Sequence, residues 1–226
     1  MALILSLETS TENCSVALHD DGKLVALSES LKEKSHAEKI ILLIKNCFEI
    51  AGKSLHQTDA IAVSKGPGSY TGLRIASSTA KGLCFALDKP LIGVNTLQAL
   101  AYQYRINGFL ICPTIDARRM EIYYGLYDEN NKNVKPDAAE IIDKQFLHNY
   151  LKENKVLFIG NGANKCSEVI SHPNAYFHID SKASAASVGT IAELFFKEEW
   201  FENLELFEPN YLKEFYTTFV KSNTQN

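Results

Sequence analysis

The sequence lacks the features that mark several large classes of protein. Its five cysteines are odd in number and form no CxxC pair, which argues against a disulfide framework and against a zinc ribbon. Its longest aliphatic run, at 40–44, is far shorter than the ~20 apolar residues of a membrane-spanning helix. The apolar start of the chain has no basic segment and is interrupted by Glu8, so we expect no signal peptide. These absences predict a soluble protein of the reducing cytoplasm, without membrane attachment.

An excess of positive charge is also absent. The 23 lysines and arginines are outnumbered by 27 acidic residues, which gives a net charge of -4. Because proteins that bind RNA on their own usually present a basic face, this chain is a poor candidate for binding RNA by itself, which leaves a function in RNA chemistry through a partner compatible with its charge. The hydrophobic fraction of 46% and the charged fraction of 22% are those of an ordinary globular protein, and they exclude disordered and collagen-like chains.

Two halves of the chain carry the same order of predicted elements, namely three strands, a helix, a strand and a helix. The first half predicts strands at 2–7, 15–18, 23–30, 60–64 and 90–94 and helices at 35–51, 71–87 and 95–104. The second half predicts strands at 109–117, 121–128, 134–142 and 156–160 and helices at 143–153 and 184–200. Strands that alternate with helices indicate the α/β class, and the repetition predicts two lobes, 1–104 and 105–226, the second with a polar tail.

The limits of the first helix have recognisable signals. Ser35 and Glu38 have the spacing of a capping box, and Gly52 is placed to end the helix. The apolar residues of this helix cover an arc of about 180°, wider than the stripe of an ordinary surface helix. A deeply buried helix pair explains most of this width, and a face for a partner protein explains the excess. We assign the candidate partner surface on the two helices to Ile41, Ile44, Phe48, Leu73, Arg74, Ala76 and Ala80.

A glycine-rich loop joins the fourth strand to the second helix. Gly66 and Gly68 flank Pro67, so backbone amides can approach a ligand closely, and the helix that follows favours anions at its N-terminus. This arrangement is compatible with a phosphate site, although the lysine and hydroxyl residue that end a P-loop are missing. A tight turn without any ligand is the simpler alternative.

Two polar loops stand at matching places in the two halves. Glu8, Thr9 and Ser10 could bind a phosphate through hydroxyl groups and amides, or could bond to their own backbone. Asp116 and Arg118 open the second set of strands. They could bind a phosphate or the acidic group of a partner, or could form an internal ion pair.

No familiar catalytic or metal-binding motif is present. His36 stands on the first helix, but the position one turn later, where a second metal ligand would be needed, is Ile40. The chain has no GxSxG and no HExxH sequence. We therefore expect no bound metal and no catalytic residue.

Taken together, these residues resemble the TsaB family, formerly YeaZ, of bacterial tRNA threonylcarbamoyladenosine synthesis. The most specific matching segments are GPGSYTGLRI, at 66–75, and IDARRMEIY, at 115–123. Further matching segments occur at 5–18, 35–40, 93–101 and 208–213. The resemblance implies the ASKHA fold of actin, Hsp70 and the sugar kinases, in which each of two lobes is a five-stranded mixed sheet with helices. It also implies that Lys213 stands where the family often has arginine.

The resemblance implies a non-catalytic subunit that binds a TsaD-like threonylcarbamoyltransferase and supports it in forming N6-threonylcarbamoyladenosine at position 37 of tRNA. A TsaE-like ATPase would join the complex, and the subunit would bind tRNA only through this complex. The catalytic relative has an HxxxH metal site, of which only His36 is present here. We expect the nucleotide loops to be vestigial and no cofactor to be required; their positions are Glu8, Thr9, Ser10, Gly66, Gly68, Asp116, Arg118, Gly160 and Gly162.

The same residues are compatible with other functions. A small ATP-dependent kinase or acyltransferase would use the cleft between the lobes, with Glu8 and Asp116 as its candidate acidic groups. A metallopeptidase would follow from an old label of the family but lacks a metal motif. A homodimer formed by the same two helices is compatible with the subunit function, because a free partner face tends to pair with itself.

Overall fold

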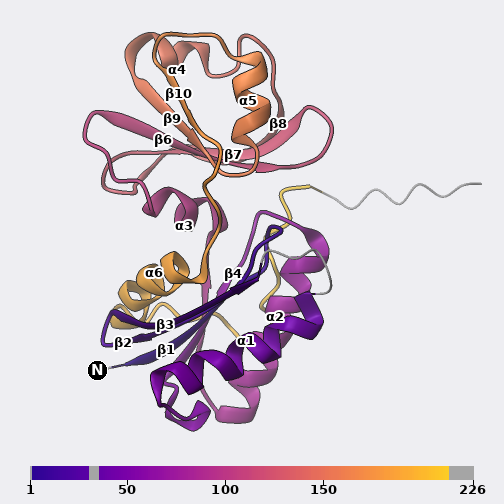
Figure 1. Cartoon of the computed structure of the whole chain (residues 1–226), viewed down its shortest axis with the longest axis vertical. Coiled ribbons are helices and arrows are strands. Elements are labelled where there is room, and N and C mark those ends of the chain that lie inside the picture. The colour runs from indigo at the N-terminus through magenta and orange to yellow at the C-terminus, as the bar shows by residue number, and fades with distance from the viewer. Residues whose placement is uncertain (1, 31–35, 214–226) are drawn as a thin grey trace, which may run out of the picture.

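The computed structural model of the protein describes residues 2–30 and 36–213. These residues form two five-stranded sheets that lie one above the other along the long axis of the molecule (Figure 1). We call the part that holds the first sheet lobe one and the part that holds the second sheet lobe two. Each sheet combines parallel and antiparallel neighbours. The predicted α/β class and the two-lobed architecture are therefore confirmed.

Lobe one is a sheet covered on both faces. Its strand order is β3-β2-β1-β4-β5, and β1 is antiparallel to β2 but parallel to β4. Alternate residues of these strands point to opposite faces, so each face has its own hydrophobic core. Helices α1 and α2 cover one face and α6 covers the other. The elements are β1 (Leu3–Glu8), β2 (Cys14–Asp20), β3 (Lys23–Ser30), α1 (His36–Ala51), η1 (Leu55–Gln57), β4 (Ala60–Ser64), α2 (Tyr70–Leu87), β5 (Leu91–Val94) and α6 (Ala185–Lys197).

Lobe two repeats this plan with shorter helices. Its strand order is β10-β9-β6-β7-β8, in which β6 is parallel to β9 and antiparallel to β7. Helices α4 and α5 cover the outer face, and α3 packs on the face that is turned toward lobe one. The elements are α3 (Thr96–Tyr102), β6 (Phe109–Asp116), β7 (Glu121–Tyr127), β8 (Asn133–Ile141), α4 (His148–Glu153), β9 (Lys155–Ile159), α5 (Ala163–Val169) and β10 (Ala175–His178).

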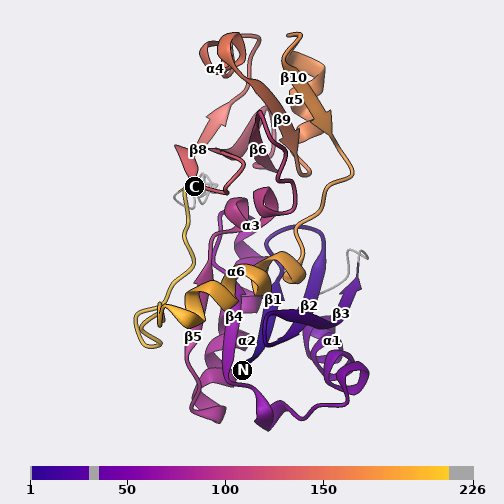
Figure 2. The ribbon, with the colours of Figure 1, turned by 90° about the vertical axis from the view of Figure 1, so that its left-hand side faces the viewer.

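The structure differs from the predicted division at residue 104, because each lobe takes one helix from the other half of the chain. Helix α6 belongs to the second half but packs on lobe one, through Val188 and Ile191 against Ile4. Helix α3 precedes lobe two in the sequence and packs on its sheet. The chain therefore passes between the lobes more than once, as the two side views show (Figures 1 and 2).

Several predicted elements are confirmed and a few are not. Helix α1 ends at Ala51, and Gly52 follows with a φ of +61°, as its position predicted. Ser35, the predicted cap, lies outside the described residues. The sequence missed α5 and β10, which are too short to show a clear period. None of the helices in the described ranges is long and apolar enough to cross a membrane.

Candidate functional site

A cleft of about 1280 Å³ lies between the two lobes. From lobe one it is lined by the loop after β1 and the loop before α2, and from lobe two by the β6–β7 hairpin. The chain after α6 forms another part of its wall. Of the predicted nucleotide-loop residues, the ones that line this cleft are Ser10, Gly68, Asp116 and Arg118.

Glu8 does not face the cleft, because its side chain is completely buried. Its Oε1 accepts a hydrogen bond from the backbone N–H of Ser10 at 2.6 Å. Its Oε2 has no hydrogen-bond partner among the described residues. Burial raises the pKa of this carboxyl above its usual value, although the backbone hydrogen bond from Ser10 acts in the opposite direction. The buried position of Glu8 does not fit a group that contacts a substrate in the cleft.

The glycines around Pro67 make room for other parts of the same chain. A Cβ on Gly68 would lie 2.5 Å from the carbonyl oxygen of Ser10, and one on Gly66 would lie 2.6 Å from that of Asn210. A Cβ on Gly72, in the first turn of α2, would lie 1.9 Å from the carbonyl oxygen of Thr9. The hydroxyl of Thr9 donates a hydrogen bond to the Gly72 carbonyl at 2.7 Å. These close approaches favour the tight turn over the phosphate site.

The glycines of the second lobe have the same explanation. Gly160 has a φ of +91°, and a Cβ there would lie 2.2 Å from the carbonyl oxygen of Thr114. A Cβ on Gly162 would lie 3.0 Å from the side chain of Thr114. The loop packs directly on β6, so contacts within the chain account for its glycines.

Asp116 forms an internal ion pair, but with a residue that the sequence analysis did not identify. Its Oδ1 lies 2.5 Å from Lys165 Nζ and accepts a hydrogen bond from the backbone N–H of Arg118 at 2.5 Å. Lys165 belongs to α5, one of the two elements missed by sequence, so no local signal pointed to it. The side chains of Arg118 and Arg119 are exposed, and the described residues offer them no hydrogen bond or ion pair. Both arginines have left-handed φ values, +71° and +50°.

His36 is held by the loop after β1. Its Nε2 lies 2.9 Å from the carbonyl oxygen of Thr11, a hydrogen bond that orients the ring. Ile40, one turn later, is buried in the core of lobe one. Within the residues placed by the structure, no three side chains of the metal-binding types come together.

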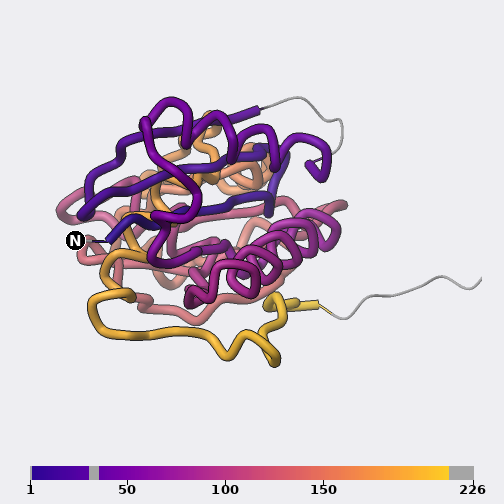
Figure 3. The backbone as a smooth tube through the Cα atoms, turned by 90° about the horizontal axis from the view of Figure 1, so that it is seen from below, coloured from indigo at the N-terminus to yellow at the C-terminus, as the bar shows by residue number. Residues whose placement is uncertain are grey.

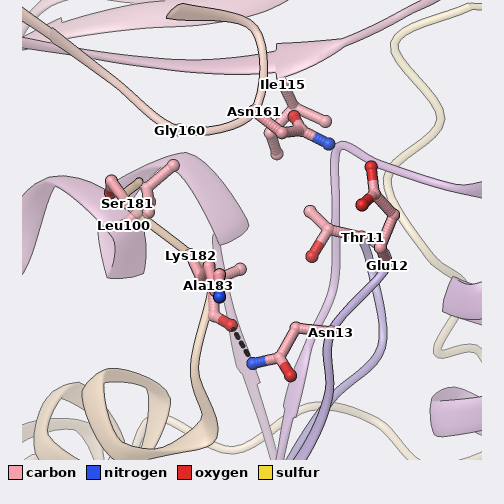
Figure 4. A pocket seen from close by; sticks show the side chains of 10 residues that line it. All are labelled: Thr11, Glu12, Asn13, Leu100, Ile115, Gly160, Asn161, Ser181, Lys182 and Ala183. Atoms are coloured by element: carbon pink, nitrogen blue, oxygen red, sulfur yellow. Dashed lines mark hydrogen bonds between the residues drawn. The ribbon is translucent and has the colours of Figure 1, made fainter. Parts of the chain in front are cut away.

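A second cavity, of about 50 Å³, adjoins the cleft between the lobes and shares Thr11 and Asn161 with it (Figure 4). The side-chain amide of Asn13 donates a hydrogen bond to the carbonyl oxygen of Ala183 at 2.9 Å beside it. Leu100 and Ile115 contribute apolar surface. A volume of this size can hold a few water molecules and is far too small for a nucleotide.

The predicted partner surface requires a correction, because five of its seven residues are buried in the core of lobe one. They are Ile44, Phe48, Leu73, Ala76 and Ala80. Helix α1 packs both on the sheet and beside α2, so its wide apolar arc reflects contacts within the chain. Of the predicted set, Ile41 and Arg74 are exposed.

The most exposed apolar side chain of these helices is not in the predicted set. Phe85, near the end of α2, is 85% exposed, and Ile41 on α1 is 58% exposed. Arg74, Ser78 and Phe85 are separated by four and seven residues, which places them on one face of α2. Phe85 lies outside the continuous apolar arc of α2, on the side of Arg74. A large apolar residue on the polar side of a helix is the sequence signal that could have identified it.

Comparison with known proteins agrees with this architecture. The sequence model of TsaD, the tRNA N6-adenosine threonylcarbamoyltransferase, matches residues 29–218. The chain is 37% identical over 199 residues to the tRNA threonylcarbamoyladenosine biosynthesis protein TsaB of Haemophilus influenzae, which covers 78% of this chain and 83% of that protein. It is 35% identical over 154 residues to TsaB of Escherichia coli, with 66% of each chain covered.

Solved structures show the same fold. A protein of Pseudomonas aeruginosa with similarity to peptidase YEAZ superposes with a TM-score of 0.84 and 28% identity, covering 94% of this chain and all of that one. The activator of 2-hydroxyisocaproyl-CoA dehydratase from Clostridium difficile shares the fold at a TM-score of 0.52 and 9% identity, covering 88% and 97% of the two chains. That likeness places the chain in the ASKHA fold class. The chain belongs to the TsaB family of tRNA threonylcarbamoyladenosine biosynthesis proteins, within the wider family that the TsaD model describes.

Proposed function

We propose that the chain is a non-catalytic subunit that binds a TsaD-like threonylcarbamoyltransferase and supports it in forming N6-threonylcarbamoyladenosine at position 37 of tRNA. The observation that carries this proposal is that other parts of the same chain pack closely against the glycines of the predicted nucleotide loops. Glu8 is buried, and Gly68, Gly72 and Gly160 each make room for a backbone carbonyl. These contacts within the chain support a two-lobed frame whose glycine loops serve packing rather than catalysis.

The partner surface that we propose is the exposed face of α1 and α2. Phe85 and Ile41 supply apolar area there, and Arg74 supplies a positive charge. Aromatic side chains and arginines are enriched in the cores of protein interfaces and contribute much of their binding free energy. In the absence of the transferase, we propose that the same face pairs with a second copy of the chain.

Other members of the assembly follow from the same reasoning. A TsaE-like ATPase would join the complex, and tRNA would be bound through the complex rather than by this subunit alone. The net charge of -4 supports this division, because a lone RNA-binding subunit would usually carry a basic surface. We propose that the chain requires no metal and no nucleotide of its own.

The test is complex formation with the TsaD-like transferase of the same organism, measured by size-exclusion chromatography with light scattering. We expect a 1:1 complex that replaces any homodimer. Phe85→Asp and Ile41→Asp should each weaken binding by about tenfold or more, because a charge would replace apolar contact. Ile141→Asp is the matched control, since Ile141 is also exposed but lies on β8 of lobe two. No complex with the unaltered chain would overturn the proposal.

The kinase-like alternative requires acidic groups that face a phosphate in the cleft. Glu8 is buried and Asp116 is already paired with Lys165, so neither is free for that purpose. ATP turnover by the purified chain, lost in Asp116→Asn, would favour this alternative. We expect no turnover above that of the buffer.

A further inference from the structure

The segment 208–213 has no part in the proposed function, although its sequence was one of the matched strings. The chain that leads to it is fixed to lobe one after α6 ends. The backbone N–H of Glu202 donates to the carbonyl oxygen of Leu91 at 2.9 Å, and its side chain pairs with Lys65 at 2.9 Å. Phe207 is buried in the core of lobe one. The chain thus lies firmly alongside α2, as the view from below shows (Figure 3).

Residues 208–213, which we call the strap, continue these contacts with lobe one. The backbone N–H of Asn210 donates to the carbonyl oxygen of Lys65 at 2.6 Å. The ring of Tyr211 packs against Tyr70, with centroids 4.8 Å apart. The guanidinium of Arg74 lies 4.1 Å from the centroid of Tyr70, on the side chain that Tyr211 also contacts. Aromatic pairs and cation–π contacts are each favourable, so this cluster stabilises the contact between the strap and α2.

The far end of the strap contacts lobe two. Lys213 forms an ion pair with Glu121, the first residue of β7. Asn210, Tyr211 and Lys213 line the cleft on the way. In both side views the strap is set apart from α3 and from 179–184, where the chain passes between the lobes (Figures 1 and 2). The strap is therefore a separate connection across the cleft.

The two ends of the strap are held with different strength. Its hold on lobe one combines a backbone hydrogen bond with the cluster of Tyr70, Arg74 and Tyr211. Among the residues that the structure describes, its hold on lobe two is the one ion pair of Lys213 with Glu121, both partly exposed. Partly exposed ion pairs contribute little free energy, so the end on lobe two should release first.

We propose that the strap is a clasp that sets the separation of the lobes. With Lys213 on Glu121, the cleft is held at the width seen here. When this pair opens, the strap stays on α2 and lobe two is free to move about the remaining connections. This inference concerns the chain alone and goes beyond the proposed function.

The test is the distance between the lobes in solution, measured by pulsed electron spin resonance on spin labels at Asn46→Cys in α1 and Lys152→Cys in α4. Both positions are exposed. All five native cysteines are buried, and burial raises the pKa of Cys14 and Cys47 to about 11, so they should not take up label. Excess unlabelled protein removes signals between molecules.

The variants are Lys213→Glu and Glu121→Lys, singly and together, with Tyr211→Ala to weaken the other end. Each single reversal should raise the population at longer distance at least about twofold, and the double reversal should restore the parent distribution. Lys53→Glu is the matched control, because Lys53 pairs with Asp20 at 2.6 Å within lobe one. Distributions that are unchanged in both single reversals and in Tyr211→Ala would overturn the proposal, whatever the outcome of transferase binding.

Discussion

The side-chain amide of Asn95 donates a hydrogen bond to Asp137 Oδ2 at 2.6 Å and so joins the start of α3 to β8 of lobe two. The same side chain caps α3, because its Oδ1 accepts from the backbone N–H of Gln98 at 2.9 Å. Asp137 also accepts hydrogen bonds from Tyr127 and Asn133. The carboxylate of Asp137 therefore fixes α3, the helix between the two lobes, to the sheet of lobe two.

Replacing this carboxylate should destabilise the fold. Asp137→Leu would leave the donors on Asn95 and Tyr127 without their acceptor, at a cost of about 1–3 kcal/mol for each buried group. Chemical denaturation followed by circular dichroism measures the change. Asp180→Leu is the control, since Asp180 is exposed. Equal stability of the two variants would contradict the role given to Asp137.

Two glycines of α2 should respond in opposite ways to alanine. A methyl group on Gly72 would collide with the Thr9 carbonyl, whereas Gly82 has nothing within 4 Å of the added carbon. Gly72→Ala should therefore lower the melting temperature or prevent folding. Gly82→Ala should stabilise the helix by about 0.5–1 kcal/mol, because alanine has the higher helix propensity. A stabilising effect of Gly72→Ala, measured by calorimetry, would show that the loop around Thr9 is not tightly packed.

Two phenylalanines on neighbouring helices should separate folding from binding. Phe48 is 7% exposed and Phe85 is 85% exposed. Phe48→Ala should lower the free energy of unfolding by about 3–5 kcal/mol, because it leaves a cavity in the core. Phe85→Ala should change stability by less than about 0.5 kcal/mol and weaken only the complex. Urea titrations measure the stability of both variants, and the binding assay measures the complex formed by Phe85→Ala. Equal losses of stability in the two variants would contradict the separate functions of these residues.

The buried carboxyl of Glu8 should make stability depend on pH. Its pKa in the folded chain is raised above the usual 4.5 by burial, so the folded state holds this proton to higher pH than the unfolded state. Its contribution to stability is therefore present below pH 4.5 and is lost as the pH rises through the folded value.

Glu8→Gln removes this titration and keeps an oxygen for Ser10. Its melting temperature should exceed that of the parent by about 2–4 °C near pH 8, which corresponds to ~1 kcal/mol in a chain of this size. The advantage should shrink toward pH 4.5. A difference between the two proteins that does not change with pH would contradict a raised pKa in the parent.

Local pattern was sufficient for most elements of this fold. The short apolar runs at 2–7 and 60–64 predicted strands, and these strands are buried because their side chains meet two different cores. Gly52 predicted the end of α1 because glycine adopts a left-handed φ without strain. The doubled order of elements predicted two lobes because both sheets repeat one plan.

The arrangement of distant segments was decided only by the tertiary structure. A helix wheel measures how much of a helix is apolar, but it cannot distinguish burial within the chain from burial against a partner. Phe48 and Leu73 were therefore assigned to a partner surface although both are buried. Lys165 pairs with Asp116 across 49 positions, a separation without any periodic signal. The strap likewise meets Glu121 only because the chain returns past α2 and crosses the cleft. Sequence by itself determined most of the elements, because their signals lie within a few neighbouring residues. The contacts between the lobes needed the folded chain, because their partners are far apart in sequence.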